Sequence, residues 1–365
     1  MNRVYLTNNK PVNFTFNQRP DTFKVKENNR IKLHKRGDYR VLEATKVSIS
    51  TMEMVEYLSS VLKIGESEIG YAGLKDKHAT TTQFITLPRY VNFKKFNNSN
   101  RVSLKEIGFC SDRLRVGNLI SNSFEIVLEN VTCSEFEKLE IAFNRIKEFG
   151  FANFFGYQRF GSLDDSSTKG KKISQRGKGS KNQNSKILLA AYQAKSFNEW
   201  LNFRLELSRD IINKETSRKL DIIPPTLLKE LSNNNSIFKL LPGDLGYFYK
   251  KVKKDFKITN NIKKYTDEFL SRKYRPTGVL FGSSVRFSNS IAGKIEREYI
   301  DYSFAALRGA RRDAWVWARE CNISHNPKKE EATLSFTLPP GSYATVLLEE
   351  LLNRTLQSSS SRNNF

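Results

Sequence analysis

Asp76 is the first residue of this chain whose type and neighbours suggest chemistry. It stands between Lys75 and Lys77, shortly after Gly73, in the segment GYAGLKDKHATTTQF. An exposed carboxylate at the end of a strand can act as a nucleophile or base on a polyanion held by the flanking lysines. Lys and Asp are also common in solvated turns, so the three residues alone leave both interpretations open.

The elements that must position Asp76 are predicted from hydrophobic spacing. Residues 22–27 alternate as in a strand, and Val41 to Ile49 form a second extended segment. From Met52 to Leu62 the apolar residues recur at helical spacing. Residues 69–74 are predicted as a short buried strand whose end delivers Asp76 into a turn.

Further elements follow along the chain. Phe124 to Val131 is predicted as a strand, and Ser134 and Glu137 have the spacing of a capping box for a helix that runs to Gly150. Near the C-terminus, a strand is predicted at 332–338 and a final helix at 343–352.

The segment from Ser162 to Lys186 is polar and cationic, and it has few residues that could form a core. We expect a mobile loop, which is either an RNA-clamping arm or a solvated linker. From Ile187 an amphipathic helix begins a mostly helical unit that extends to about residue 310.

The charge of the chain points to a polyanionic partner. Its 61 Lys and Arg against 38 Asp and Glu give a formal net charge of +23. A basic surface gains affinity for nucleic acid by displacing counterions from phosphates, so nucleic acid is the predicted partner.

Other classes of protein are disfavoured. No stretch approaches the ~18 consecutive apolar residues of a spanning helix, so we expect no membrane association. The N-terminus lacks the apolar run of a secretory signal, and we expect a cytoplasmic protein. The three cysteines and three histidines are scattered, which predicts neither a disulfide framework nor a metal site.

Five segments of this sequence match recurring patterns. GYAGLKDKHATTTQF is similar to the pattern GxKDxxAxTxQ, NFFGYQRFG at 153–161 to NYFGxQRFG, and FTLPPGSYAT at 336–345 to FxLPxGSxAT. FKVKE at 23–27 resembles DFxVxE, and YQAKSFN at 192–198 resembles SAxxSxxFN. In these motifs and in their order, the sequence resembles the TruD family of tRNA pseudouridine synthases over nearly the whole chain.

The resemblance implies an α+β fold in two domains. Residues 1–180 and 311–365 would form a pseudouridine synthase catalytic domain with a mixed antiparallel sheet. Residues 181–310 would form a largely helical TruD-type insertion domain, in a V-shaped molecule.

It also implies an enzyme that isomerises a uridine of tRNA, in bacterial members the one at position 13 of the D arm, to pseudouridine without a cofactor or metal. The target base must leave its stack, which costs a few kcal/mol that basic and aromatic contacts must offset. We expect a monomer whose partner is tRNA. The alternative is a non-catalytic RNA-binding or RNA-folding protein on the same scaffold.

By this resemblance Asp76 is the nucleophile. Residues expected to contact or stack on the target nucleotide are Phe23, Asn153, Phe155 and Tyr343. The three aromatic residues could equally be core residues, and Asn153 could be a turn residue. Lys75 and Arg159 are either partners of a phosphate or carboxylate or surface charges.

The chain departs from the family pattern at several positions. Asn17 stands where a basic residue is usual, and Thr22 replaces an aspartate; Arg19 could substitute for the missing cation. Glu349 replaces an arginine, and Ser121 occupies a glycine position. We expect these differences to affect details of RNA contact only.

Overall fold

The computed structural model describes residues 3–6, 10–93, 96–160, 165–175, 183–248, 256–259, 261–304 and 307–356. The chain forms two compact units, each built from segments distant in sequence. Unit 1 contains Met1–Pro11, Ile141–Trp317 and Ser342–Phe365, and unit 2 contains Val12–Glu140 and Ala318–Gly341. The two domains predicted from the resemblance, residues 1–180 with 311–365 and residues 181–310, stay a prediction.

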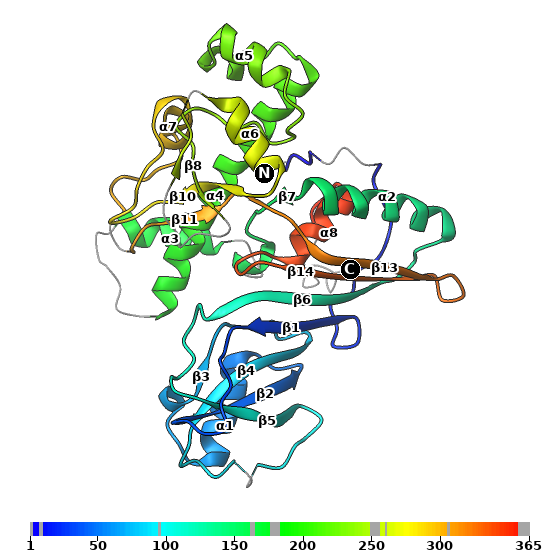
Figure 1. Cartoon of the computed structure of the whole chain (residues 1–365), viewed down its shortest axis with the longest axis vertical. Coiled ribbons are helices and arrows are strands. Elements are labelled where there is room, and N and C mark those ends of the chain that lie inside the picture. Colours follow the sequence, from blue (N-terminus) through cyan, green and yellow to red (C-terminus); the bar gives the residue numbers. More distant parts are fainter. Residues whose placement is uncertain are drawn as a thin grey trace. The chain divides into compact units, whose positions relative to one another are not determined.

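Unit 2 is built on a mixed sheet (Figure 1). In the described residues the strand order is β13-β14-β6-β1-β4-β2-β5, and β3 pairs with β4. Only β1 and β4 of these neighbours run parallel. The predicted mixed, largely antiparallel sheet is therefore confirmed. Its strands are β1 Phe23–Asn29, β2 Tyr39–Val47, β3 Gly70–Tyr71, β4 Thr80–Pro88, β5 Val102–Cys110, β6 Leu119–Leu128, β13 Arg319–Asn326 and β14 Glu331–Leu338.

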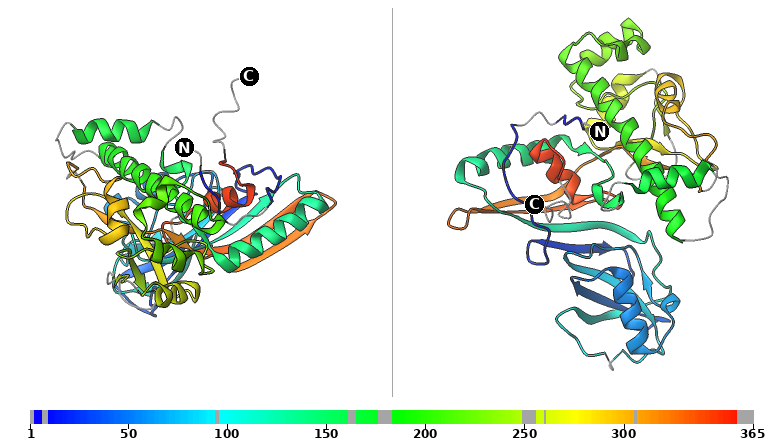
Figure 2. Two further views of the ribbon diagram at one scale, coloured as in Figure 1. Left: turned by 90° about the horizontal axis from the view of Figure 1, so that it is seen from above. Right: turned by 180° about the vertical axis from the view of Figure 1, so that it is seen from behind.

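Helix α1, Thr51–Leu62, packs on the β2–β4 part of this sheet (Figure 2). It begins with a capping box, in which Ser50 Oγ accepts the Glu53 amide at 3.1 Å and the Glu53 carboxylate accepts the Ser50 amide at 2.7 Å. Its buried face, which includes Met54 and Leu58, belongs to one apolar cluster with Leu42 and Ile85. The helix therefore packs against β2 and β4, and the segment that carries Asp76 leads into β4.

Strand β3 is shorter than expected. Residues 69–74 were predicted as a strand, but only Gly70–Tyr71 pairs with β4, at Thr86 and Ile85. The chain then leaves the sheet in a loop that returns at Thr80. This loop contains Asp76.

Helix α2, Cys133–Phe149, ends where expected but begins differently. The predicted capping box at Ser134 is wrong, because Thr132 accepts the Glu135 amide at 3.3 Å and Ser134 lies inside the first turn. At the other end Gly150 has φ +76°. A Cβ there would lie 2.5 Å from Trp315 Nε1, so both the backbone angle and the close approach require glycine.

Unit 1 contains helices and a four-stranded sheet of order β11-β10-β8-β9. The helices and 3₁₀ turns are α3 Ser166–Gln175, α4 Gln183–Asn213, α5 Pro225–Ser232, α6 Ile262–Leu270, α7 Ser290–Arg297, α8 Ala344–Leu352, η3 Tyr157–Arg159 and η4 Arg218–Ile222; η1, Glu66–Glu68, belongs to unit 2. The strands are β8 Leu245–Phe248, β9 Phe256–Lys257, β10 Tyr274–Leu280 and β11 Ala310–Asp313, and a separate pair consists of β7 Phe151–Ala152 and β12 Trp315–Val316. Within the described ranges, no helix is long and apolar enough to cross a membrane.

The loop predicted at 162–186 is wrong over Ser166–Gln175, which forms α3, and over residues 183–186, which begin α4; that helix was predicted to begin at Ile187. This polar segment is helical because it packs on α4: a Cβ at Gly170 would lie 2.1 Å from the Leu188 carbonyl oxygen. Ile173 packs against the buried apolar cluster that contains Leu189. The remaining residues of the predicted loop before Gln183, apart from Asp165, lie outside the described residues.

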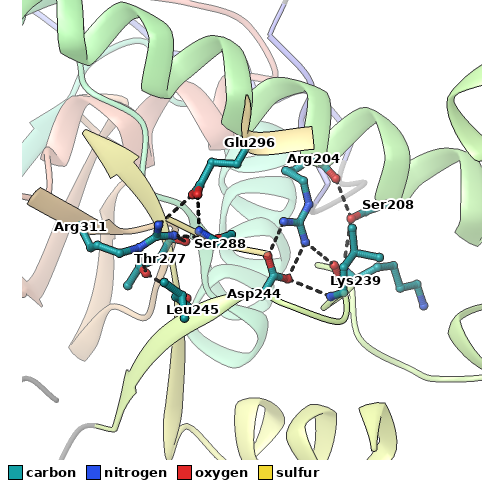
Figure 3. A network of polar contacts seen from close by, with 10 residues as sticks. Arg204, Ser208, Lys239, Asp244, Leu245, Thr277, Ser288, Glu296 and Arg311 are labelled. Carbon is teal, nitrogen blue, oxygen red and sulfur yellow. Dashed lines mark hydrogen bonds and ion pairs between the residues drawn. The ribbon is translucent and has the colours of Figure 1, made fainter. Parts of the chain in front are cut away.

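A buried polar network ties the elements of unit 1 together (Figure 3). The Arg204 guanidinium on α4 binds both carboxylate oxygens of Asp244, at 2.7 and 2.8 Å, just before β8. Arg311 on β11 binds Glu296 on α7 at 2.9 Å. Removing one partner of such a pair would leave a buried charge uncompensated, so the network holds these elements in one arrangement.

Candidate active site

The loop between β3 and β4 holds Asp76 by its backbone. The Lys46 ammonium group donates to the Asp76 carbonyl oxygen at 2.6 Å and to the Ile49 carbonyl oxygen at 2.5 Å. The Thr51 hydroxyl accepts the Lys75 amide at 2.9 Å. Strand β2 and helix α1 thus anchor the loop on both sides of Asp76, and none of these anchors uses its carboxylate.

Asp76 is half-buried, and the exposed carboxylate expected from the sequence is corrected in this respect. Burial raises its pKa, while the positive charges of Lys46 and, more weakly, Lys75 oppose the rise. Lys46 itself has no exposed surface, and burial lowers its pKa to about 8. A partly desolvated carboxylate beside a buried ammonium group is typical of catalytic sites.

Lys75 is engaged inside unit 2. Its ammonium group lies 2.5 Å from the Glu27 carboxylate, and both side chains are buried. Lys77, by contrast, pairs with Glu53 at 2.7 Å on the surface. Lys75 is therefore not a solvated surface charge, and any contact of Lys75 with RNA stays a prediction.

Phe23 lies in the core of unit 2. It is 1% exposed, and its ring contacts those of Phe16 and Phe124 at centroid distances of 5.8 and 6.1 Å. Its contact with a nucleotide stays a prediction.

The region around Asn17 shows how two of the sequence departures are accommodated. Asn17 and Arg19 both bind the Glu129 carboxylate, each at 2.6 Å. The Thr22 hydroxyl accepts the Arg19 amide at 3.1 Å, as the aspartate that it replaces could do. Arg19 thus pairs with Glu129 and Asp21 rather than with Asp76.

In unit 1, Phe155 and Tyr343 lie together, with ring centroids 6.2 Å apart. The Arg312 guanidinium lies 3.8 Å from the Phe155 centroid and 5.9 Å from that of Tyr343. The Arg159 guanidinium lies 5.7 Å from the Phe155 ring. Two cations therefore neighbour an aromatic ring that keeps part of its surface exposed.

The backbone of Phe155 is held by a side chain of α4. The Asn198 carboxamide accepts the Phe155 amide at 2.8 Å and donates to its carbonyl oxygen at 3.0 Å. These bonds imitate strand pairing and fix the direction in which the ring points. The YQAKSFN motif thus positions the NFFGYQRFG motif.

Asn153 is 3% exposed, and protein groups use part of its hydrogen-bonding capacity. Its amide nitrogen donates to the Asp313 carbonyl oxygen at 2.9 Å, and its side-chain oxygen accepts from Arg312 at 3.1 Å. A carboxamide has two donor hydrogens and two acceptor lone pairs, so these bonds leave one of each. Burial lowers the pKa of Arg312 to about 10, which leaves the guanidinium protonated at neutral pH.

Tyr343 is the residue before α8, and a buried ion pair holds this helix. The Arg3 guanidinium binds Glu349 at 2.5 Å and Glu350 at 3.2 Å, with all three side chains buried. Glu349, the residue that replaces the family's arginine, therefore has an internal partner.

Lys46 and Arg312 are functional candidates that we did not predict. Strand β2 buries Leu42, Ala44 and Lys46 at alternate positions, so a lysine on the apolar face was the available signal. Arg312 directly follows Arg311 in the short strand β11, and the sequence pattern does not show which of the two arginines lies beside Phe155. Among the described residues, no group of three or more His, Cys, Asp or Glu could hold a metal ion.

Comparisons with known proteins agree with these motifs. The family model described as tRNA pseudouridine synthase D (TruD) matches residues 2–180 and 225–351. A protein of a Nitratiruptor species named tRNA pseudouridine synthase D is 34% identical over 364 residues, covering 98% of this chain and 99% of that protein. One of the same name from Wolinella succinogenes is 35% identical over 365 residues, covering 98% and 99%.

A solved structure shows the same fold. The crystal structure of a putative tRNA pseudouridine synthase D from Methanosarcina mazei matches with a TM-score of 0.65 and 23% identity, covering 96% of each chain. The family model covers well over half of the sequence, and the relatives align over nearly its whole length. The chain therefore belongs to the TruD family of tRNA pseudouridine synthases.

Proposed function

We propose that this protein isomerises a uridine of tRNA to pseudouridine, with position 13 of the D arm as its target and Asp76 as its nucleophile. Family membership supports the reaction class. The net charge of +23 supports a nucleic-acid substrate.

The reaction needs no external oxidant or reductant. The N1–C1′ bond breaks, the uracil turns, a C5–C1′ bond forms, C5 loses its proton to water and N1 gains one. The Asp76 carboxylate can assist by attacking the ribose or the uracil covalently, or by removing a proton as a base. Each route ends with the carboxylate released unchanged.

The observation that carries the proposal is the way in which the loop presents Asp76. Lys46 and Thr51 hold the backbone of residues 75 and 76 through hydrogen bonds of 2.6 and 2.9 Å. The carboxylate is partly removed from water, and its pKa is raised. A positioned, partly desolvated carboxylate needs little reorganisation to react.

Asn153 and Phe155 are proposed to bind the target base. Phe155 offers a partly exposed ring, and Asn153 retains one donor and one acceptor, which suit the edge of a uracil. Arg312 binds both residues and is proposed to hold them in place.

The test is to incubate the protein with unmodified tRNA transcripts in the absence of any cofactor, and to map pseudouridine by a chemical primer-extension stop assay. We expect one modified uridine, at position 13. Asp76→Asn should bind tRNA with nearly unchanged affinity and form no product.

Asp21→Asn is the matched control, because Asp21 is a highly exposed carboxylate of the same unit. It should retain full turnover. If the wild-type protein forms no pseudouridine in any tRNA while an active family member does, the proposal fails and the alternative of a non-catalytic RNA-binding protein stands.

A further inference from the structure

The loop that carries Asp76 also carries an apolar side chain that the proposed chemistry does not use. Leu74, two residues before Asp76, is 66% exposed. The two neighbouring positions on its N-terminal side, Ala72 and Gly73, are small, and Leu74 is absent from the apolar cluster that α1 forms with the sheet. A leucine in this position contributes nothing to the core of unit 2.

A second exposed apolar residue lies on an adjoining turn. Val116 is 73% exposed, and it occupies the turn in which the Asn118 side chain accepts the Arg115 amide at 2.7 Å. The next residue, Gly117, donates its amide to the Ala72 carbonyl oxygen at 2.8 Å. This bond ties the Val116 turn to the base of the Asp76 loop, so two apolar tips stand on adjoining turns.

These two residues are unusual within their unit. Among the exposed large apolar side chains of unit 2 in the described residues, only Tyr90, at 73%, matches Leu74 and Val116 in exposure. Exposed charged residues accompany the two tips: Lys77 follows Leu74 by three positions and Arg115 precedes Val116. Apolar tips among cations suit a ligand with phosphates outside and an apolar stack inside, which is the architecture of RNA.

We propose that Leu74, supported by Val116, is a wedge that enters the base stack of the tRNA and occupies the space left by the flipped target uridine. This inference rests on the proposed function, because only a reaction on a flipped base requires the space to be filled. Apolar side chains inserted between base steps offset the unstacking cost in other nucleic-acid complexes. Leu74 would thus be a positioning residue that acts through the RNA.

The first test compares kcat/KM for tRNA among three variants. Leu74→Ala should lower kcat/KM about tenfold or more, since most of the apolar area buried against the bases is removed. Leu74→Met keeps the apolar bulk and should stay within about threefold of wild type. Tyr90→Ala is the control, equally exposed in the same unit, and should leave the rate unchanged.

The second test reads base flipping without turnover. A tRNA with 2-aminopurine next to the target uridine is bound to Asp76→Asn, and its fluorescence should rise as the neighbouring base loses its stacking partner. Adding Leu74→Ala to that protein should reduce the rise at saturating tRNA. A transcript with an abasic site in place of that neighbour should be modified by Leu74→Ala and wild type at similar rates, because no stack remains to be filled.

Two results would overturn the wedge. One is an unchanged kcat/KM and 2-aminopurine signal for Leu74→Ala. The other is equal impairment of Leu74→Ala and Leu74→Met together with a lower unfolding temperature, which would show a structural role. If wild type itself forms no pseudouridine, the proposed function fails and the wedge fails with it; full turnover by wild type with no effect of Leu74→Ala is the separate result that removes the wedge alone.

Discussion

Lys46→Met provides a sharp test of how the protein prepares Asp76. Lys46 is fully buried on β2, and its ammonium group joins the Asp76 carbonyl oxygen to the Ile49 carbonyl oxygen. Methionine has a similar length and is apolar, so the substitution removes the charge and both hydrogen bonds while the volume is nearly kept. The Asp76 carboxylate remains in the chain.

The size of the effect follows from two opposing terms. Two carbonyl oxygens lose a charged donor, and each unsatisfied buried acceptor costs about 1–3 kcal/mol. The unfavourable burial of the ammonium group, which lowers its pKa to about 8, is relieved at the same time. We expect a net loss of about 1–3 kcal/mol in the free energy of unfolding. Turnover should fall about 100-fold, because a shift of about 1 Å at a reacting group has an effect of that order.

The assay is single-turnover pseudouridine formation at saturating tRNA, alongside urea unfolding at pH 7. Lys26→Met serves as the control, since Lys26 is an exposed lysine on β1 of the same sheet and its substitution also removes one positive charge. It should keep the wild-type rate. A wild-type single-turnover rate for Lys46→Met would refute the claim that Lys46 positions or electrostatically supports Asp76.

The same substitution has a predicted pH signature. Lys46 loses its proton at about pH 8, so wild-type turnover should decline above that pH, and this decline should be absent in Lys46→Met. Because the folded pKa lies below the usual 10.5, the unfolded chain binds more protons between about pH 8 and 10.5. The free energy of unfolding of wild type should therefore rise relative to that of Lys46→Met as the pH is raised through that window.

Three further substitutions test one site within unit 2 and two contacts within unit 1. Asp76→Asn should raise the unfolding temperature at pH 7, because burial raises the pKa of Asp76 and thus disfavours the charged form in the folded protein; a lower temperature by calorimetry would contradict this. Glu349→Ala should lower the urea-unfolding free energy by about 1.5–3 kcal/mol, since the buried Arg3 loses its 2.5 Å partner; a change below about 0.5 kcal/mol, the level typical of surface substitutions, would count against it. Arg312→Met should lower kcat/KM about 10- to 100-fold, because it removes the cation over Phe155 and the hydrogen-bond donor to the Asn153 side chain. An unchanged kcat/KM would show that Arg312 has no part in base binding.

The sequence predicted β1, β2 and α1 well because local periodicity determines them, whereas the strand before Asp76 was predicted longer than Gly70–Tyr71. Strands β1 and β2 and helix α1 alternate between apolar and polar positions at the spacing of their own structure, and packing of α1 on the sheet reinforces that pattern. Gly150 was correctly placed at the end of α2 because its left-handed backbone requires glycine.

The remainder depends on contacts that local sequence does not encode. Helix α3 is polar along its length and is helical because Gly170 allows close approach to Leu188 on α4. Thr132 rather than Ser134 caps α2. Threonine and serine are both favourable N-cap residues, so the sequence alone does not show which of these two positions begins the helix. The partners of Lys75 and Glu349 lie 48 and 346 residues away, so neither ion pair could be read from spacing.

The proposed role of Asp76 in converting one tRNA uridine to pseudouridine is testable in cells. Pseudouridine is mapped across total RNA from cells that carry either the wild-type chain or Asp76→Asn as their sole copy, with equal protein levels verified. Loss of a single tRNA signal, at position 13, in the Asp76→Asn cells is the predicted result. An unchanged pseudouridine map would contradict the assignment of Asp76 and of the reaction.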